Sequence, residues 1–525
     1  MSAPALAMPM SIDYRSFESV LLSCSIPPEE AAKFRDVRLP FELKPHQLRA
    51  LHCGLAWQRF GLYHEARTGK TIVMQLLAIY FSRYGMKTVF LMPPVLFTQF
   101  MNEFLRIEGS GATIEMLDGS AAAKRTKLQS WATGEKPAPD VLLTTKEIFS
   151  GPFGKLRKSL VLLNQDYISR VYNCLTWDEC HIGLQDETSQ IFKSVERFIN
   201  SNRHNRLILA TGTPITSELK AAYSHIRLKT PDAYVSRRHF DNNHVRYDTI
   251  NIKAERSASC PDGMRRISVI GGYLNTELLS KNLYALSDRA RKLEVLDIKV
   301  PNVQVIDIKL TSDHLKFYQQ AVRDRLVEIE GEMVDLRQEQ TLRQFALRIT
   351  TSPEFGGKIV KKNAVIDGIQ ALLDTSNVKE NKVLIFANFN NSVTYLRDKF
   401  EKYQPAVVYG KQTPEYNRQE VERFRTDREC RIIIVNPQAG GVGLTLGDVC
   451  QTAIFAEPVS SPGLFDQAAS RVLLSGQTQP ISVYILRILQ TASPAAIESM
   501  LSRTAEISKV MKDKTTLIDE LLPKA

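Results

Sequence analysis

The sequence lacks the features that mark several classes of protein. No apolar run approaches the roughly 18 residues of a membrane-spanning helix, so we expect no membrane partner. Its seven cysteines are scattered and include no Cys-x-x-Cys pair, which argues against a disulfide framework or a zinc site. The first ten residues lack the basic and apolar regions of a secretory signal. We therefore expect reduced thiols in an intracellular, cytoplasmic protein.

Blocks of like charge are also absent, although the chain is basic overall. Its formal net charge is +11 over 525 residues, yet no block of five or more basic residues occurs. A nucleic acid or another polyanionic partner is one interpretation, and a solvated, lysine-rich surface is the other. The composition, 43% hydrophobic and 24% charged, is typical of a globular protein, and the length suggests two to four domains.

The first chemical element is a Gly69-Lys70-Thr71 triplet. An apolar helical pattern follows at once over residues 72–79, so N–H groups at a helix start would face a bound anion. Gly69 would allow close approach, Lys70 would reach the β/γ-phosphates of ATP, and Thr71 would hold Mg²⁺. The residues ahead of the triplet are interpreted as a turn-forming segment. Alone, the triplet supports phosphate binding and an ordinary helix start equally.

Three residues ahead of the triplet are candidates for nucleotide contact. Arg67 and Thr68 directly precede Gly69, and we expect them to line the phosphate loop. Further upstream, the amide of Gln47 could form two hydrogen bonds to an adenine edge. The alternative for Gln47 is a surface glutamine on a helix. His64 stands where the strict phosphate-loop pattern has a glycine.

A second chemical element is Asp178-Glu179, which follows an apolar strand pattern beginning at Cys174. Ligands of α/β sheets bind at the carboxyl ends of the strands, where this pattern places both carboxylates. Asp178 suits a Mg²⁺ shell and Glu179 suits polarisation of the attacking water. A solvated turn is the alternative, but the preceding phosphate-loop pattern favours the site.

Short apolar runs alternate with helical patterns along the whole chain. Runs of this kind, bounded by turn residues, predict buried parallel strands and a doubly wound α/β fold. A long helical stretch is expected at about residues 314–347. The predicted strands occupy residues 88–92, 140–145, 174–178, 206–210, 382–387, 406–410, 431–435 and 481–486.

The order of three motifs carries a family resemblance. Gly-Lys-Thr at 69–71, Asp-Glu-Cys-His at 178–181 and Thr-Gly-Thr-Pro at 211–214 resemble motifs I, II and III of superfamily 2 helicases, most closely the Swi/Snf-type translocase branch. The resemblance implies that His181, Thr211 and Thr213 couple hydrolysis to movement on nucleic acid. Without large insertions, the chain is similar to compact bacterial or viral members.

The second half of the chain extends this resemblance. Asn436–Thr445 is rich in glycine and resembles motif V, with Gly441 and Gly443 expected near phosphate. Residues 467–477 resemble motif VI, which implies nucleotide contacts from Gln467 and a catalytic Arg471. The family usually has a second arginine three positions after Arg471, where this chain has Leu474. We expect Arg471 to face the cleft and Leu474 to pack into the core of lobe 2 from a helical position.

The resemblance implies two RecA-like, doubly wound parallel-sheet lobes in tandem, with an ATP cleft between them. We expect an unassigned segment at 1–40, lobe 1 at 41–225, a connecting or inserted segment at 226–300, and lobe 2 at 301–525. The basic residues of Arg289–Lys292 could contact nucleic acid or form a solvated helix face. The implied protein is a monomeric DNA-dependent ATPase and translocase that uses ATP and Mg²⁺; an RNA helicase and a non-hydrolysing nucleic-acid scaffold are the alternatives.

Overall fold

The computed structural model describes residues 13, 15–157, 160–253, 264–324, 326–329, 332–336, 338–375, 378, 381–438, 446–459, 461–474, 476–477 and 479–511. The chain forms two compact units. Unit 1 contains the described residues of Met1–Val295 with the end of the last helix, and unit 2 contains those of Leu296–Ser508. In the described part of the chain, no helix has both the length and the apolar character needed to cross a membrane.

Unit 1 is built on a seven-stranded sheet whose neighbouring strands are all parallel. In spatial order the strands are β11 (Ser287–Ala290), β1 (Arg59–His64), β8 (Arg206–Ala210), β7 (Cys174–Asp178), β2 (Thr88–Leu91), β4 (Val141–Thr144) and β3 (Ile114–Met116). Because β1, β8 and β7 are neighbours, the loops that follow them meet at one edge of the sheet.

Alternate strand residues serve two separate cores, one on each face of this sheet. In β2, Phe90 joins one core, while Val89 and Leu91 join the other. This alternation follows from the two-residue period of a strand. Apolar side chains dominate both cores, with buried threonines such as Thr88 and Thr176 among them, so the strands appear in the sequence as largely hydrophobic runs.

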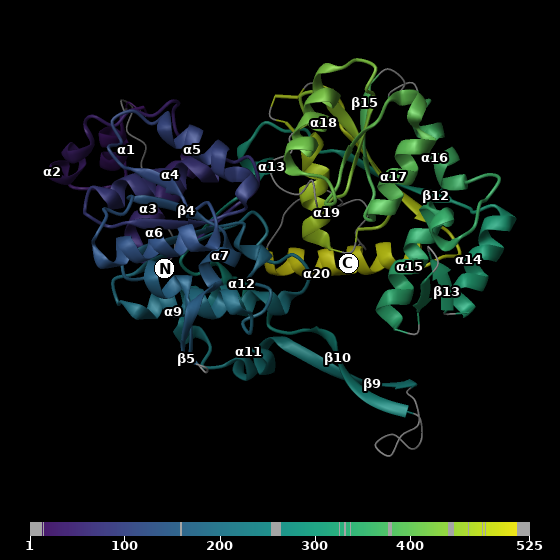
Figure 1. Cartoon of the computed structure of the whole chain (residues 1–525), viewed down its shortest axis with the longest axis horizontal. Helices are drawn as coiled ribbons and strands as arrows, with labels where there is room; N and C mark the ends of the chain where they lie inside the picture. Colours follow the sequence, from purple (N-terminus) through teal and green to yellow (C-terminus); the bar gives the residue numbers. More distant parts are fainter. Residues whose placement is uncertain are drawn as a thin grey trace. The chain divides into compact units, whose positions relative to one another are not determined.

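Helices cover both faces of the unit 1 sheet (Figure 1). The core around Phe90 is closed by α1 (Phe17–Ser23), α2 (Pro28–Ala31), α3 (Pro45–Ala56), α4 (Lys70–Ser82) and α5 (Phe97–Leu105). The opposite core is closed by α6 (Ala121–Thr133), α7 (Lys146–Ser150), α8 (Asn164–Ile168) and α9 (Gln190–Ser201). A small hairpin, β5 (Pro152–Arg157) and β6 (Leu160–Leu163), precedes α8.

The expected lobe 1 limits, residues 41–225, cut across this unit. From the N-terminal segment, Phe17, Val20 and Leu21 of α1 are buried in the first core. From the expected connecting segment, β11 completes the sheet beside β1. The boundary expected at residue 225 falls inside α10 (Ala222–Lys229), and the connecting segment also forms α11 (Arg237–His244), β9 (Val245–Lys253), β10 (Met264–Tyr273), α12 (Thr276–Tyr284) and α13 (Lys292–Val295).

Unit 2 is built on a six-stranded parallel sheet. In spatial order its strands are β12 (Asn302–Ile308), β19 (Ser482–Ile488), β18 (Cys450–Phe455), β15 (Lys382–Phe386), β17 (Ile432–Val435) and β16 (Ala406–Val408). Ile385 of β15 packs in the core beneath α16 (Ala364–Leu373) and α17 (Asn390–Lys399). The next residue, Phe386, stacks on Phe455 with ring centroids 4.7 Å apart, and Phe455 contacts Phe465 of α19 (Pro462–Ala469).

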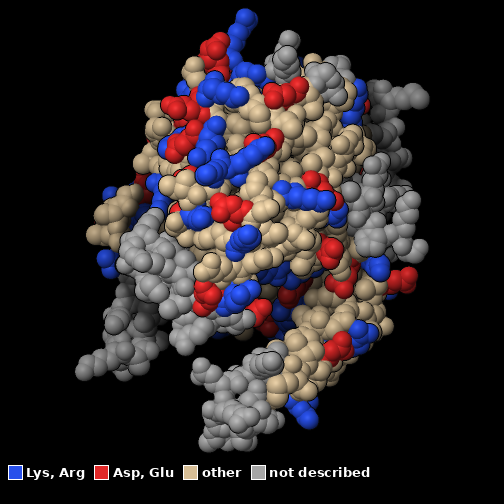
Figure 2. Space-filling view, turned by 90° about the vertical axis from the view of Figure 1, so that its right-hand side faces the viewer, with Lys and Arg blue, Asp and Glu red and all other residues tan. Residues whose placement is uncertain are grey.

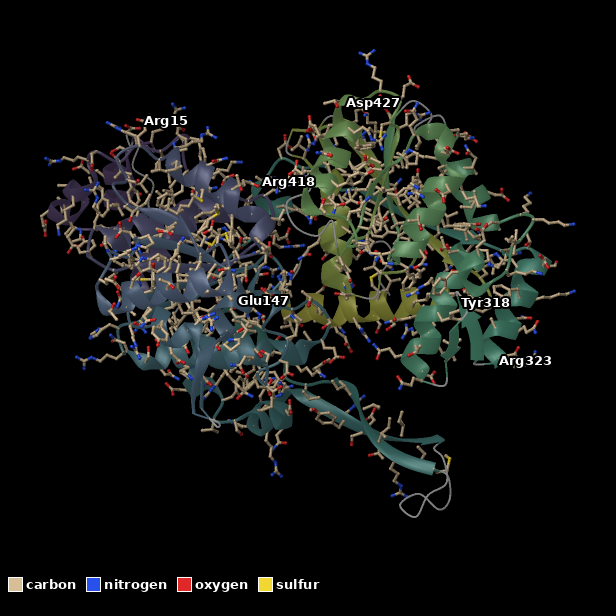
Figure 3. All side chains as sticks on the ribbon, viewed as in Figure 1. Arg15, Glu147, Tyr318, Arg323, Arg418 and Asp427 are labelled. Atoms are coloured by element: carbon tan, nitrogen blue, oxygen red, sulfur yellow. The ribbon has the colours of Figure 1, made fainter. Side chains whose placement is uncertain are left out.

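Two further helices belong to this α/β pattern. Helix α18 (Pro414–Thr426) lies between β16 and β17 in the chain, and α20 (Ser493–Met511) follows β19. On α18, Arg418 lies 3.5 Å from Glu415, and both side chains are exposed (Figure 3). The two units together confirm the predicted fold class of two RecA-like α/β lobes in one chain.

Two sequence-based predictions of local structure are wrong. The first half of the segment interpreted as a turn before Gly69, residues 61–64, is the end of strand β1, which lies inside the sheet. The expected helix over residues 314–347 is interrupted by a hairpin of β13 (Leu326–Ile329) and β14 (Glu332–Asp335). Leu326–Ile329 contains the alternation and β-branched residues that favour a strand over a helix.

The helices on either side of this hairpin are α14 (Ser312–Asp324) and α15 (Glu339–Thr351). They share a small core that buries Tyr318 of α14, whereas Arg323 at the end of the same helix is exposed (Figure 3). The helical period predicts this division, because residues five apart lie on different faces.

Candidate active site of unit 1

The phosphate-loop residues lie between β1 and α4, as the sequence predicts. Gly69 is the N-cap of α4 and has φ 83°, a left-handed conformation that glycine adopts at little cost. Lys70 and Thr71 form the first turn of the helix, whose N–H groups lack intrahelical acceptors. Arg67 also has a positive φ of 71°, which is costly for a residue with a side chain.

Gln47 packs directly behind the loop. Its Nε2 donates to the Thr68 carbonyl at 3.1 Å, and its Oε1 accepts from the Lys44 N–H at 2.8 Å. A Cβ on residue 69 would lie 2.1 Å from Gln47 Nε2, so the contact also requires glycine there. In this structure the Gln47 amide therefore supports the loop, and its predicted contact with adenine stays a prediction.

Asp178 and Glu179 lie at the carboxyl end of β7, next to the loop. Asp178 is the last residue of the strand, and its Oδ1 accepts from the Glu179 N–H at 3.0 Å. Glu179 has φ 49°, and its Oε1 lies 3.7 Å from Lys70 Nζ. A left-handed backbone at a glutamate is a form of strain often found at functional sites.

The pKa values of Asp178 and Lys70 are shifted within this cluster. Burial, followed by the neighbouring Glu179, raises the pKa of Asp178 to about 6. For Lys70, burial disfavours the ammonium, but Glu179 and Asp178 outweigh it and raise its pKa. Lys70 is therefore a fixed cation, while the two adjacent carboxylates repel each other.

The predicted coupling residues continue this cluster toward β8. His181 Nδ1 lies 3.3 Å from Glu179 Oε2 and 2.8 Å from Thr211 Oγ1. The Thr213 N–H in turn donates to Thr211 Oγ1 at 3.1 Å. His181 and Thr211 are both buried. One connected series of polar contacts thus runs from Lys70 to the turn after β8.

That turn also touches the phosphate loop itself. A Cβ on Gly212 would lie 2.9 Å from the Cα of Glu65, so only glycine permits this approach. The backbone of the turn and that of the loop are therefore in direct van der Waals contact. A shift of the loop must displace the turn that holds Thr211.

Sequence reasoning missed a buried polar group behind the loop. His46 Nε2 lies 2.8 Å from the Thr68 carbonyl, and His64 Nε2 lies 2.7 Å from Asp288 Oδ2, with the two rings 5.6 Å apart. Burial lowers the pKa of both histidines, so we expect them to be neutral at pH 7. His64 was visible as a departure from the phosphate-loop pattern, but no sequence signal linked it to Asp288.

Glu65 joins the loop to the segment that leaves unit 1. Its N–H donates to the Ala290 carbonyl, and its carboxylate lies 3.4 Å from Arg291 Nε and 3.1 Å from the Lys292 N–H. Arg291 and Lys292 are each only 6% exposed. They therefore do not form the solvated helix face considered from the sequence, and their burial does not favour nucleic-acid contact.

The predicted site residues of unit 2 are described only in part. Gly441 and Gly443 of the glycine-rich loop lie outside the described residues. Gln467 lies on α19, and Arg471 lies on a short 3-10 helix, Ser470–Val472, whose carbonyl at residue 471 accepts from the Leu446 N–H. Arg471 is half-buried, so part of its side chain is accessible.

Leu474 does not occupy the helical core position expected from the sequence. The 3-10 helix ends at Val472, and Leu473 is extended and buried. Leu474 is only half-buried; it packs near Gly447, and its N–H donates to Gln477 Oε1 at 3.0 Å. The chain turns away from the helix at this point, which a three-residue spacing cannot reveal.

Glu457, another residue missed from the sequence, joins two strand ends of unit 2. Its Oε2 accepts from the Asn388 N–H at 2.7 Å and its Oε1 accepts from the Ser392 hydroxyl at 2.5 Å. Asn436, at the start of the glycine-rich loop, donates from its amide to the Asn388 carbonyl at 2.8 Å. Burial raises the pKa of Glu457 to about 7, against the opposing effect of these hydrogen bonds.

We expect Glu457→Gln to alter how stability depends on pH. The Glu457 carboxyl binds its proton more tightly in the folded protein than in the unfolded chain, where its pKa is near 4.5. The stability of the wild type therefore falls as pH rises from about 4.5 to 7. Chemical denaturation should show the variant gaining up to about 3 kcal/mol relative to wild type between pH 5 and pH 8. Glu401→Gln, at an exposed position, is the control. Parallel pH profiles for wild type and Glu457→Gln would contradict this.

The sequence matches two families. An SNF2-related domain matches residues 53–353, and a helicase conserved C-terminal domain matches residues 363–475. The chain is 20% identical to an uncharacterized ATP-dependent helicase of Mycoplasma pneumoniae, over 89% of this chain and 42% of that protein. It is 24% identical to the Arabidopsis thaliana protein CHROMATIN REMODELING 24, over 85% of this chain and 44% of that protein.

A third relative is a DNA repair and recombination protein RAD54-like of Drosophila willistoni, 22% identical over 68% of this chain and 48% of that protein. The chain thus spans less than half the length of these three relatives. Among solved structures, it is similar to a Sulfolobus solfataricus SWI2/SNF2 ATPase core in complex with dsDNA, at 15% identity over 91% of this chain and 98% of that one. The TM-score of 0.35 is too low to support an argument.

Proposed function

Because this chain belongs to the SNF2-related family, we propose that it is an ATP-dependent translocase that moves along nucleic acid, with DNA as its substrate. The observation that carries the proposal is the connected polar series from Lys70 through Glu179 and His181 to Thr211. Coupled ATP hydrolysis requires a lysine that binds phosphate, a carboxylate that polarises the attacking water, and polar contacts that connect this carboxylate to a neighbouring strand end.

Each residue has a distinct proposed task. Lys70 and the N–H groups of the α4 start bind the β/γ-phosphates. Glu179 holds and polarises the attacking water, which places a proton on its carboxylate. Because His181 lies between Glu179 and Thr211, the change at Glu179 reaches Thr211 and the turn after β8. This turn, rather than the reacting centre, is where we place the coupling to nucleic acid.

The residues present also fit Mg²⁺. The Thr71 hydroxyl and the Asp178 carboxylate are hard oxygen ligands of the kind this ion prefers, and it usually takes few protein ligands beside the phosphates. A cation there would offset the burial and the repulsion by Glu179 that together raise the pKa of Asp178. When bound, Mg²⁺ would neutralise phosphate charge. No cluster of three His, Cys, Asp or Glu side chains suited to a metal occurs among the described residues.

Two relatives named above support DNA as the substrate, since one is described as a chromatin remodelling protein and another as a DNA repair and recombination protein. The test is phosphate release by the purified chain with no nucleic acid, duplex DNA, single-stranded DNA or RNA. We expect DNA to stimulate release most. Stimulation by RNA alone would favour an RNA helicase, and no release under any condition would favour a non-hydrolysing scaffold.

We further expect binding to depend on the phosphate backbone rather than on base sequence. Log affinity for a DNA duplex should fall linearly with log salt concentration, because each neutralised phosphate releases counterions. Fluorescence anisotropy with two scrambled duplexes of equal length and composition measures both effects. Equal salt slopes and affinities for the two duplexes are expected. Salt-independent binding, or a strong preference for one duplex, would overturn this view.

A further inference from the structure

Strands β9 and β10 form a two-stranded antiparallel ribbon of their own. The ribbon follows α11 and extends away from the other elements of unit 1 (Figure 1). A two-stranded ribbon buries little apolar surface and is marginally stable in water by itself. Its strands have nine and ten residues, which is longer than a direct connection between α11 and α12 requires. Stability alone does not account for this length.

The register assigns the ribbon residues to two chemically different faces. Tyr247 pairs with Ile270, Thr249 with Ser268 and Asn251 with Arg266, and side chains directly opposite each other share a face. We call the exposed polar residues of this set the donor face: Tyr247, Thr249, Asn251, Arg266 and Ser268. Each of these side chains can donate a hydrogen bond.

Acidic residues are absent from the donor face. Asp248 is the one carboxylate within the β9 and β10 sequences, and alternation places it on the opposite face with Ile250 and Ile267. Among the described basic side chains of the two strands, Arg266 lies on the donor face, whereas Arg246 lies on the opposite face, 3.5 Å from Asp248. The donor face thus presents hydrogen-bond donors and the positive charge of Arg266, without a carboxylate to repel an anion.

The net positive charge of the chain does not by itself produce a uniformly basic surface. On the face seen in Figure 2, Lys and Arg are interspersed with Asp and Glu. The donor face differs because its charged member, Arg266, is basic and stands among neutral hydrogen-bond donors.

We propose that the donor face binds the sugar–phosphate backbone of duplex nucleic acid; this inference rests on the proposed function. Arg, Ser, Thr, Asn and Tyr are the side chains that commonly contact phosphates. A two-stranded ribbon also has dimensions that a duplex groove admits. The ribbon then gives unit 1 a duplex-binding surface that is separate from the ATP-binding residues.

The decisive experiment compares Arg266→Glu with Arg203→Glu in the full chain. Arg203 is exposed in unit 1, outside the ribbon, and its substitution changes the net charge equally. The probe is a 30-base-pair duplex of random sequence, titrated at several salt concentrations. Arg266→Glu should weaken binding and reduce the slope of log affinity against log salt by about 1, whereas Arg203→Glu should retain the wild-type slope. Nucleotide binding should be unchanged in both variants, which verifies their folding.

A second variant removes neutral donors without changing charge. Thr249→Ala with Asn251→Ala should weaken duplex binding severalfold at all salt concentrations. If the wild type binds the duplex but Arg266→Glu behaves like Arg203→Glu, the ribbon proposal is wrong and the proposed function stands. If the wild type binds no nucleic acid, both are wrong.

Discussion

Lys70→Ala is expected to reduce ATP turnover to background, a loss of about 10³-fold. The substitution removes the buried cation that would face the β/γ-phosphates and also leaves Glu179 and Asp178 without their common counter-charge. ATP affinity should fall together with turnover, because the lysine contributes to ground-state binding. Calorimetry with a non-hydrolysable nucleotide measures the first quantity, and phosphate release measures the second.

Glu179→Gln should separate these two properties. The glutamine keeps the shape of the side chain but cannot accept a proton from water, so hydrolysis should stop while ATP still binds. It also removes the negative neighbour that raises the pKa of Asp178. Lys127→Ala, which breaks an ion pair with Glu115 at the surface of the same unit, is the control and should retain both activities. Equal loss of nucleotide binding in Lys70→Ala and Glu179→Gln would contradict the roles assigned to them.

Arg471→Ala is expected to cost at least about a hundredfold in nucleic-acid-stimulated turnover. An arginine that stabilises γ-phosphate charge contributes roughly 10³–10⁵ in related phosphate-loop enzymes, and this motif has one arginine where the family usually has two. ATP binding should change much less than turnover, because the charge it stabilises develops in the transition state. Stopped-flow phosphate release with duplex DNA gives the rate.

Two variants of unit 2 serve as comparisons. Arg487→Ala removes a partly exposed arginine bound to Asp307, and turnover should be retained. Leu474→Arg should gain less than about twofold. The reason is that Leu474 lies beyond the 3-10 helix that carries Arg471, beside Gly447, and not at a buried helical position. Normal turnover in Arg471→Ala would show that another residue performs this role.

Local patterns in the sequence were sufficient for much of the fold and site. Runs such as Thr88–Leu91 and Ile432–Val435 are apolar on both faces, and only a buried strand accommodates that pattern. Likewise, the Gly-Lys-Thr triplet at 69–71, taken together with the later motifs, predicts a phosphate loop, and Asp178 after an apolar run predicts a carboxylate at a strand end. These features depend on neighbouring residues, so the sequence alone determined them.

Pairings between distant segments were decided only by the tertiary structure. Asp288 reaches His64 because β11 pairs with β1, and Glu457 reaches Ser392 because the ends of β18 and β15 are adjacent. The donor face exists only in the register that sets Asn251 opposite Arg266. Burial then shifts the pKa of Asp178 and Glu457 by removing water from carboxylates that look ordinary in the sequence. Sheet order, register and desolvation arise from contacts between residues that are far apart in the chain. The local hydrophobic periodicity of the sequence does not predict these contacts.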